Sequence, residues 1–172
     1  MDYVELHCHT FYSLRDGASS PVELITRAKQ LGYSALAATD HDGLYGAMEF
    51  AKTATEYGVQ PITGAEVTTT GGYHLTLLVE TRQGYQNLCR LLSAAYQTFG
   101  KDAPEVTLDS LRDHHAGLIV LSGCRSGELS RWVEAGDLDE AERVARRFRD
   151  WFGPDQFFIE LQYNLVQGDK AR

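Results

Sequence analysis

A His-x-His pair near the start of the chain is the feature of this sequence that most directly suggests chemistry. The first apolar run, Tyr3–His9, reads Tyr-Val-Glu-Leu-His-Cys-His. Because alternate residues of an extended strand point to the same side, His7 and His9 share one face and Cys8 points to the other. Two imidazoles at a strand end can ligate one metal ion. A single such pair is weak evidence, so the prediction depends on ligands at other strand ends.

Further candidate ligands lie at the ends of other predicted strands. In α/β sheets and barrels, the edge formed by the strand C-termini carries the active site. The candidates are Asp16 in the loop after the first strand, Asp40 and His41 after the strand 35–39, Glu66 at the end of the strand 60–66, His74 at the start of the strand 73–80, and Cys124 after the strand 118–121.

These residue types suit a cluster of divalent metal ions. Imidazole binds zinc, iron and manganese, thiolate favours zinc, and a carboxylate such as Glu66 can bridge two ions. Two ions roughly 3.5–4 Å apart can clamp a phosphoryl group and activate water. The set contains no dedicated serine or cysteine nucleophile, so it indicates hydrolysis of a phosphate ester.

Each candidate also has an ordinary structural explanation. A lone histidine such as His7 is more often a hydrogen-bonded core residue than a ligand. Asp40 could belong to a turn or cap a helix, and Glu66 could pair with an arginine at the surface. Cys124 could be a small buried apolar residue, and the remaining histidines could be plain loop or strand residues. The occurrence of all of them at one edge is harder to explain in this way.

Short apolar runs alternate with amphipathic segments, an order that is typical of an α/β protein with a mostly parallel sheet or barrel. Ser20 is the expected N-cap of the first helix, with Pro21 in its first turn and Gly32 as its stop. Strands are predicted at 4–6, 35–39, 60–66, 73–80, 118–121 and 157–161, and helices at 22–31, 44–57, 84–99, 127–132 and 138–152.

The composition narrows the class of protein. The 172 residues carry 16 basic and 24 acidic side chains, a net charge of −8, which disfavours general binding to nucleic-acid phosphates. The three cysteines show no CxxC spacing, and we expect reduced thiols in a cytoplasmic protein. No run has the length of a transmembrane helix, so no membrane partner is expected. His114 and His115 fall at a probable helix end and are assigned a structural role.

Several motifs, in order along the chain, resemble those of the PHP (polymerase and histidinol phosphatase) family. More narrowly, they are similar to the N-terminal PHP domain of bacterial DNA polymerase III alpha subunits, with a lean toward the error-prone type. The resemblance extends from Tyr3 to about Leu161. The motifs are His7-Cys8-His9-Thr10, Tyr12-Ser13-Leu14-Arg15-Asp16-Gly17, Ala38-Thr39-Asp40-His41, Gly64-Ala65-Glu66, His74-Leu75-Thr76, Gly84-Tyr85-Gln86-Asn87-Leu88 and Leu121-Ser122-Gly123-Cys124.

The resemblance implies a distorted (β/α)7 barrel with two or three divalent ions, zinc being favoured over manganese and iron. It implies that Asp40 is structural or orients a ligating histidine from behind. It also implies that His9, His41 and Glu66 take part in catalysis. The metal ligands that it implies are His7, His9, Asp16, His41, Glu66, His74 and Cys124.

The end of the chain departs from the family pattern. The family has a final Asp-x-His pair, whereas Asp169 is followed by Lys170, Ala171 and Arg172. We therefore expect residues 1–172 to form the N-terminal part of a PHP domain whose barrel is incomplete. No polymerase activity is expected of it.

Three functions remain open from the sequence. The first is a metal-dependent phosphoesterase of the 3′–5′ exonuclease type, acting on a DNA 3′ end in replication or repair, with the rest of the polymerase alpha subunit as its partner. The second is a structural module that binds metal without turnover. The third is a free-standing phosphatase for small molecules.

Overall fold

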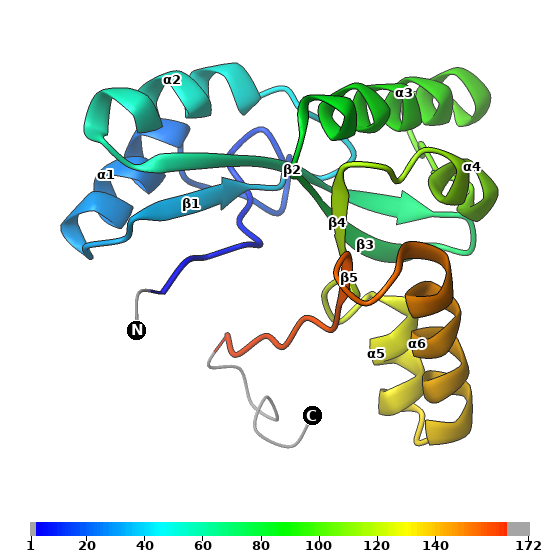
Figure 1. Ribbon diagram of the computed structural model, residues 1–172. Helices are drawn as coiled ribbons and strands as arrows, with labels where there is room; N and C mark the ends of the chain where they lie inside the picture. The colour runs from blue at the N-terminus through cyan, green and yellow to red at the C-terminus, as the bar shows by residue number, and fades with distance from the viewer. Residues whose placement is uncertain (1–2, 165–172) are drawn as a thin grey trace.

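The computed structural model describes residues 3–164, which form a mixed α/β fold around one five-stranded sheet (Figure 1). The strands are paired in the order β1-β2-β3-β4-β5 and comprise β1 (Ala35–Ala38), β2 (Gln60–Thr69), β3 (Tyr73–Val79), β4 (Leu118–Leu121) and β5 (Phe157–Phe158). The helices are α1 (Pro21–Gln30), α2 (Ala47–Tyr57), α3 (Arg82–Phe99), α4 (Leu108–Asp113), α5 (Glu128–Glu134) and α6 (Leu138–Phe152). Asp169 lies outside the described residues.

The sheet is mixed, so the prediction of a mostly parallel sheet is wrong. β1 and β2 are parallel, as are β4 and β5, but β3 runs antiparallel to both of its neighbours. The reason is the short connection after Thr69, which leaves no room for a crossover helix. Gly71 and Gly72 there have φ angles of 103° and 76°, values that glycine adopts without a steric penalty. β2 and β3 therefore form a hairpin.

The N-terminal segment follows β1 without forming a regular strand, so the strand predicted at 4–6 is present only in part. It makes one parallel bridge, between Glu5 and Leu36. Ala37 donates a backbone hydrogen bond to the carbonyl of Glu5, and Thr39 donates one to that of Cys8, both at 2.9 Å. The segment is thus held extended along β1.

Other elements also differ from the sequence prediction, and the differences at α2, β5 and α4 are larger than a shift of one or two residues. The helix predicted at 44–57 begins at Ala47, after a turn in which Asp42 has a φ of 49°. β5 is only two residues long, although a strand was predicted at 157–161. For α4, the sequence predicted only a helix end near His114. The helix begins after its N-cap Thr107, whose side chain accepts a hydrogen bond from the backbone of Ser110. α4 and β5 are too short to give a clear apolar pattern, and α2 starts late because the chain turns at Asp42 before it.

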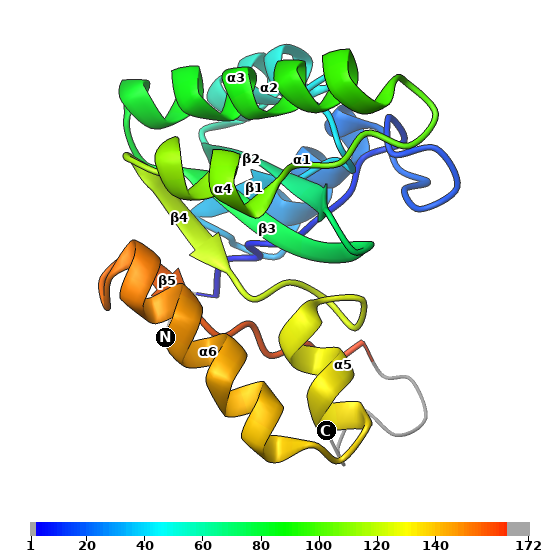
Figure 2. The same cartoon turned by 90° about the vertical axis from the view of Figure 1, so that its right-hand side faces the viewer.

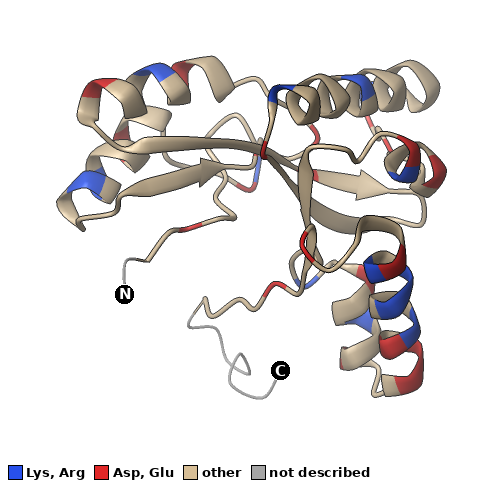
Figure 3. Cartoon of the chain, in the orientation of Figure 1, with Lys and Arg blue, Asp and Glu red and all other residues tan. Residues whose placement is uncertain are grey.

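Three hydrophobic clusters of the described residues pack against the sheet. One joins α1 and α2 to β1 and includes Ile25, Phe50 and Ala54, and a small one joins β1, β3 and β4. The largest joins α3, α4 and α6 to strands β2 to β5. In Figure 2, α3 lies along one face of the sheet, while α5 packs against α6, and α6 lies next to β5. Figure 3 shows acidic and basic residues interspersed along α6, and most of them are exposed, as is typical of an amphipathic helix.

Phe148 on α6 links these helices to the sheet. It is 1% exposed, and its ring lies 5.5 Å from that of Phe157 on β5. Phe148→Ala is expected to lower the free energy of unfolding by about 3–5 kcal/mol, because it removes a buried aromatic ring and leaves a cavity. Urea denaturation measures the loss. Leu161→Ala is the control, since Leu161 is 89% exposed; an equal loss in both variants would contradict the packing role of Phe148.

Candidate metal centre

Glu66 on β2 is the centre of the candidate site. Its side chain is only 3% exposed. The backbone N–H of Glu66 donates to the carbonyls of Thr39 and Asp40 at 3.3 and 3.2 Å, and its own carbonyl accepts from Asp42 at 2.7 Å. These hydrogen bonds place Glu66 beside the residues that follow β1. The strand does not end at Glu66 as predicted, because pairing with β3 extends it to Thr69.

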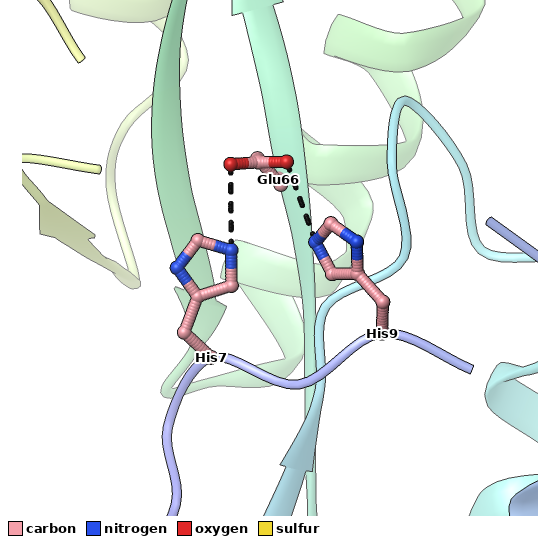
Figure 4. Close-up of side chains that lie close together, drawn as sticks. All are labelled: His7, His9 and Glu66. Carbon is pink, nitrogen blue, oxygen red and sulfur yellow. Dashed lines mark ion pairs between the residues drawn. The ribbon is translucent and has the colours of Figure 1, made fainter. Parts of the chain in front are cut away.

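Four histidines surround this carboxylate, two on each oxygen. Oε1 of Glu66 lies 3.4 Å from Nε2 of His7 and 3.1 Å from Nδ1 of His74. Oε2 lies 3.3 Å from Nε2 of His9 and 2.8 Å from Nδ1 of His41. Figure 4 shows His7 and His9 reaching the two oxygens from the same stretch of chain. A single buried carboxylate is thus shared by all four imidazoles.

The candidate ligands divide into two groups that have Glu66 in common. His7, His9 and Glu66 form one, and His41, Glu66 and His74 form the other, with the donor atoms of each group within 4.8 Å of one another. Within the described residues, His9 Nε2 and Glu66 Oε1 are buried without a hydrogen bond. Buried polar atoms are normally satisfied, so these unsatisfied nitrogen and oxygen atoms, which both belong to the group of His7, His9 and Glu66, fit a cation beside Glu66.

The mixed topology explains why these residues meet. His7 and His9 follow the segment beside β1, and His41 follows β1 itself. His74 stands at the start of β3, which is antiparallel, so its N-terminus lies at the edge where β2 ends. There it pairs with Thr68. The edge that holds the candidate site therefore collects the ends of parallel strands and the beginning of an antiparallel one.

Asp40 fixes the loop next to the site. Its carboxylate accepts hydrogen bonds from the backbone and hydroxyl of Thr10, at 2.7 to 3.0 Å, and from the Ser13 hydroxyl at 2.7 Å. The Ser13 hydroxyl in turn accepts from the backbone N–H of His41 at 2.9 Å. Within the described residues Asp40 contacts no imidazole, so it positions the backbone on either side of the site.

Of the other two predicted ligands, Cys124 lies near the four histidines and Asp16 does not. The Cys124 thiol lies 3.5 Å from Nδ1 of His74, at the margin of the second group. The Asp16 side chain is exposed, and within residues 3–164 it makes no contact with the histidines. The role of Asp16 as a ligand stays a prediction.

Sequence reasoning missed two carboxylates that contact the outer nitrogens of the histidines. Glu160 Oε1 lies 2.6 Å from His7 Nδ1, and Asp42 Oδ2 lies 3.1 Å from His41 Nε2. Asp42 also accepts hydrogen bonds from the backbone and hydroxyl of Thr68, at 2.7 and 2.8 Å. Both residues carried a signal: Glu160 directly follows an apolar run, and Asp42 directly follows His41.

Without metal, the charges in the site shift the pKa values of its members strongly. Burial lowers the pKa of His7, but hydrogen bonds with Glu160 and Glu66 outweigh it and raise the pKa to about 9. Asp42, and then Glu66, raise the pKa of His41 to about 10. Burial opposes ionisation of Glu66, yet the surrounding histidines hold its pKa far below the usual range. Burial and the charge of Glu66 raise the pKa of the Cys124 thiol to about 12.

This chain belongs to the PHP domain family, whose model matches residues 5–164. It is 43% identical over 187 residues to the error-prone DNA polymerase of Symbiobacterium thermophilum, covering 99% of this chain and 17% of the polymerase. It is 41% identical to the DNA polymerase III subunit alpha of Treponema pallidum, covering 99% of this chain and 16% of that one. The chain thus spans about a sixth of the length of these relatives, and it matches their N-terminal regions.

A solved structure supports the fold. A candidate metal-dependent phosphoesterase from Bifidobacterium adolescentis matches with a TM-score of 0.55 at 15% identity, covering 94% of this chain and 87% of that one. The predicted PHP-type α/β fold is thereby confirmed, and within the described residues β1 and β5 remain unpaired with each other, as in a partial barrel. Within the described residues, no helix combines the length and apolar character needed to cross a bilayer. The three cysteines are unpaired, as expected.

The raised pKa values of His7 and His41 predict how the stability of the metal-free protein depends on pH. Both rings hold protons more tightly in the folded than in the unfolded chain. Their stabilising contribution is complete below the unfolded pKa of about 6.5 and is lost as pH rises through about 9 to 10. Glu66 acts in the opposite sense, because its pKa is lowered: its contribution is lost only as pH falls below roughly 4.3.

Thermal unfolding in a chelator at pH 7 to 10 tests this expectation. The melting temperature of the metal-free chain should fall across this range, and stoichiometric zinc should reduce the fall because a metal ion replaces the protons. His41→Gln should flatten the dependence. His115→Gln is the control, since that ring contacts the Arg112 carbonyl and the Phe152 ring and belongs to neither ligand group. A melting temperature independent of pH in the wild type would refute the assignment.

Proposed function

We propose that this chain is a metal-dependent phosphoesterase domain that holds two divalent cations, one on each side of Glu66. The observation that carries the proposal is the sharing of Glu66 between two groups of ligands, each containing two histidines. A bridging carboxylate flanked by imidazoles is typical of two-ion hydrolytic sites. Ordinary structural carboxylates are paired with one cationic partner, whereas this one faces four rings.

Zinc is the ion that the donor set favours. Imidazole nitrogen together with carboxylate oxygen suits zinc, and the same donors accept manganese or iron. Cys124 beside His74 adds a sulfur donor at the edge of the second group. Its thiol has a raised pKa in the metal-free protein, so binding through sulfur requires an ion to displace the proton. We propose Cys124 as a ligand on this basis, and Asp16 as a ligand only on its family resemblance.

When bound, the ions supply Lewis-acid polarisation of a phosphoryl oxygen and lower the pKa of an attacking water toward about 7. The chain provides the geometry. His7 and Glu66 form the closed floor of the site, with side chains 7% and 3% exposed. His9, His41 and His74 are more open, at 17%, 26% and 21%. A substrate phosphate therefore approaches from the side of these three histidines, and His9, His41 and Glu66 are the proposed catalytic residues.

A DNA 3′ end is the proposed substrate, and the remainder of a polymerase alpha subunit is the proposed partner. The relatives are named as DNA polymerases, and a polymerase holds a 3′ end within reach of its own domains. The net charge of −8 makes the chain by itself a weak binder of DNA. The metal centre and the neighbouring polymerase would then supply most of the affinity, which favours a proofreading exonuclease over an independent nuclease.

Glu66→Gln tests the shared carboxylate. The substitution keeps the shape of the side chain but removes its charge, so zinc affinity should fall by more than about 100-fold, beyond the loss typical of a residue outside the ligand set. Elemental analysis and competition with a chelator measure bound zinc; the wild type should hold more than one equivalent. His115→Gln is the matched control. A wild type without metal, or an unchanged Glu66→Gln variant, would contradict the proposal.

Hydrolysis assays then separate the three functions. Release of nucleotides from single-stranded 3′ ends, lost in Glu66→Gln, supports the exonuclease. Metal binding without hydrolysis of any ester supports the structural module. Hydrolysis of small phosphomonoesters without action on DNA supports the small-molecule phosphatase.

A further inference from the structure

Glu160, just after β5, reaches back to the far side of His7. Its Oε1 lies 2.6 Å from His7 Nδ1, and its side chain is 9% exposed. The other ring nitrogen, Nε2, lies 3.4 Å from Glu66 Oε1. His7 is therefore held between two buried carboxylates, one on each nitrogen. Glu160 falls outside both ligand groups.

The hydrogen bonds around Glu160 determine which nitrogen of His7 carries the proton. Thr76 Oγ1 donates to Glu160 Oε2 at 3.2 Å, and Gln162 Nε2 donates to Oε1 at 2.6 Å. An ionised carboxylate only accepts, so His7 Nδ1 must donate to it. Thr76 and Gln162 also lie 3.0 and 3.2 Å from His7 Nδ1, but the Glu160 carboxylate is nearer to this nitrogen than either of them, at 2.6 Å, and the one hydroxyl proton of Thr76 goes to Glu160. The neutral ring then presents the lone pair of Nε2 to the side of Glu66.

We propose that Glu160 is a positioning residue of the metal centre, which fixes His7 as the tautomer that offers Nε2 to a divalent cation. This inference rests on the proposed two-ion site. A carboxylate behind a ligating imidazole orients the ring and increases the basicity of the ligand nitrogen, and its loss costs about 10- to 100-fold in metal affinity. The position of Glu160 on Nδ1, away from Glu66, distinguishes it from a ligand.

The short strand β5 places Glu160 for this role. Phe158 pairs with Leu121 on β4, and the Phe158 carbonyl accepts from the backbone of Ser122 at 3.0 Å. The Ser122 hydroxyl accepts from the backbone N–H of Glu160 at 2.9 Å. The two-residue strand β5 is thus sufficient to fix the backbone position of Glu160.

Zinc affinity of the purified chain, measured by competition with a chelator, tests the role. Glu160→Ala should weaken binding by about 10- to 100-fold while the number of ions bound at saturation stays equal to that of the wild type. Glu160→Gln keeps an oxygen that can accept from Nδ1 and should lose less than Glu160→Ala. It also keeps the test informative if the alanine variant fails to fold. Asp155→Ala, which removes an exposed carboxylate just before β5, should bind zinc as the wild type does.

The ring nitrogens of His7 give a second readout that a purely structural role would not move. In the zinc-loaded wild type, ¹⁵N NMR should show a proton on Nδ1 and none on Nε2. Because zinc on Nε2 leaves the ring proton on Nδ1 in every variant, the readout is its exchange with water: exchange should be slow in the wild type and in Glu160→Gln and fast in Glu160→Ala. A proton on Nε2 in the wild type, or an unchanged exchange rate in Glu160→Ala, would overturn the inference.

The remaining outcomes separate this inference from the proposed function. A wild type that binds no zinc overturns both. A wild type that binds zinc, with Glu160→Ala equal to Asp155→Ala in affinity, overturns only the role of Glu160. One ion fewer at saturation in Glu160→Ala would make Glu160 a ligand and overturn the positioning role.

Discussion

The buried carboxylate of Glu66 requires positively charged partners beside both of its oxygens. An isolated buried charge costs several kcal/mol, and the Glu66 side chain is 3% exposed. Four imidazoles face the two oxygens at 2.8 to 3.4 Å. Without metal, protons on His7 and His41 supply part of this charge, because Glu160 and Asp42 respectively, and then Glu66, raise the pKa values of the two rings. Divalent cations can take the place of those protons. The same arrangement of Glu66 and the four histidines therefore suits both the metal-free and the metal-bound protein.

The topology of the sheet brings the histidines to Glu66. The hairpin of β2 and β3 brings His74 opposite Thr68, two residues beyond Glu66. The N-terminal segment lies extended along β1 and carries His7 and His9 to the same edge. A second layer of carboxylates, Glu160 and Asp42, lies on the outer nitrogens of two of the histidines. The centre is therefore built from one shared carboxylate inside the ring of histidines and two outside it.

Much of this arrangement could be predicted from local sequence. The spacing of His7 and His9 placed both imidazoles on one side, and both do reach Glu66. The direction of β3 could not be read from its apolar pattern, because alternation is the same in parallel and antiparallel strands; the clue was the short Thr70–Gly72 connection. Glu160 was hidden within a strand predicted to extend to 161. Only pairing with β4, a long-range contact, shows that β5 ends at Phe158.

The most direct test of the shared carboxylate is anomalous X-ray scattering from crystals of the chain grown with zinc. Two anomalous peaks are expected on either side of Glu66, roughly 3.5–4 Å apart. One should be bounded by His7 and His9 and the other by His41 and His74. A single peak, or peaks that leave the Glu66 carboxylate uncoordinated, would contradict the account.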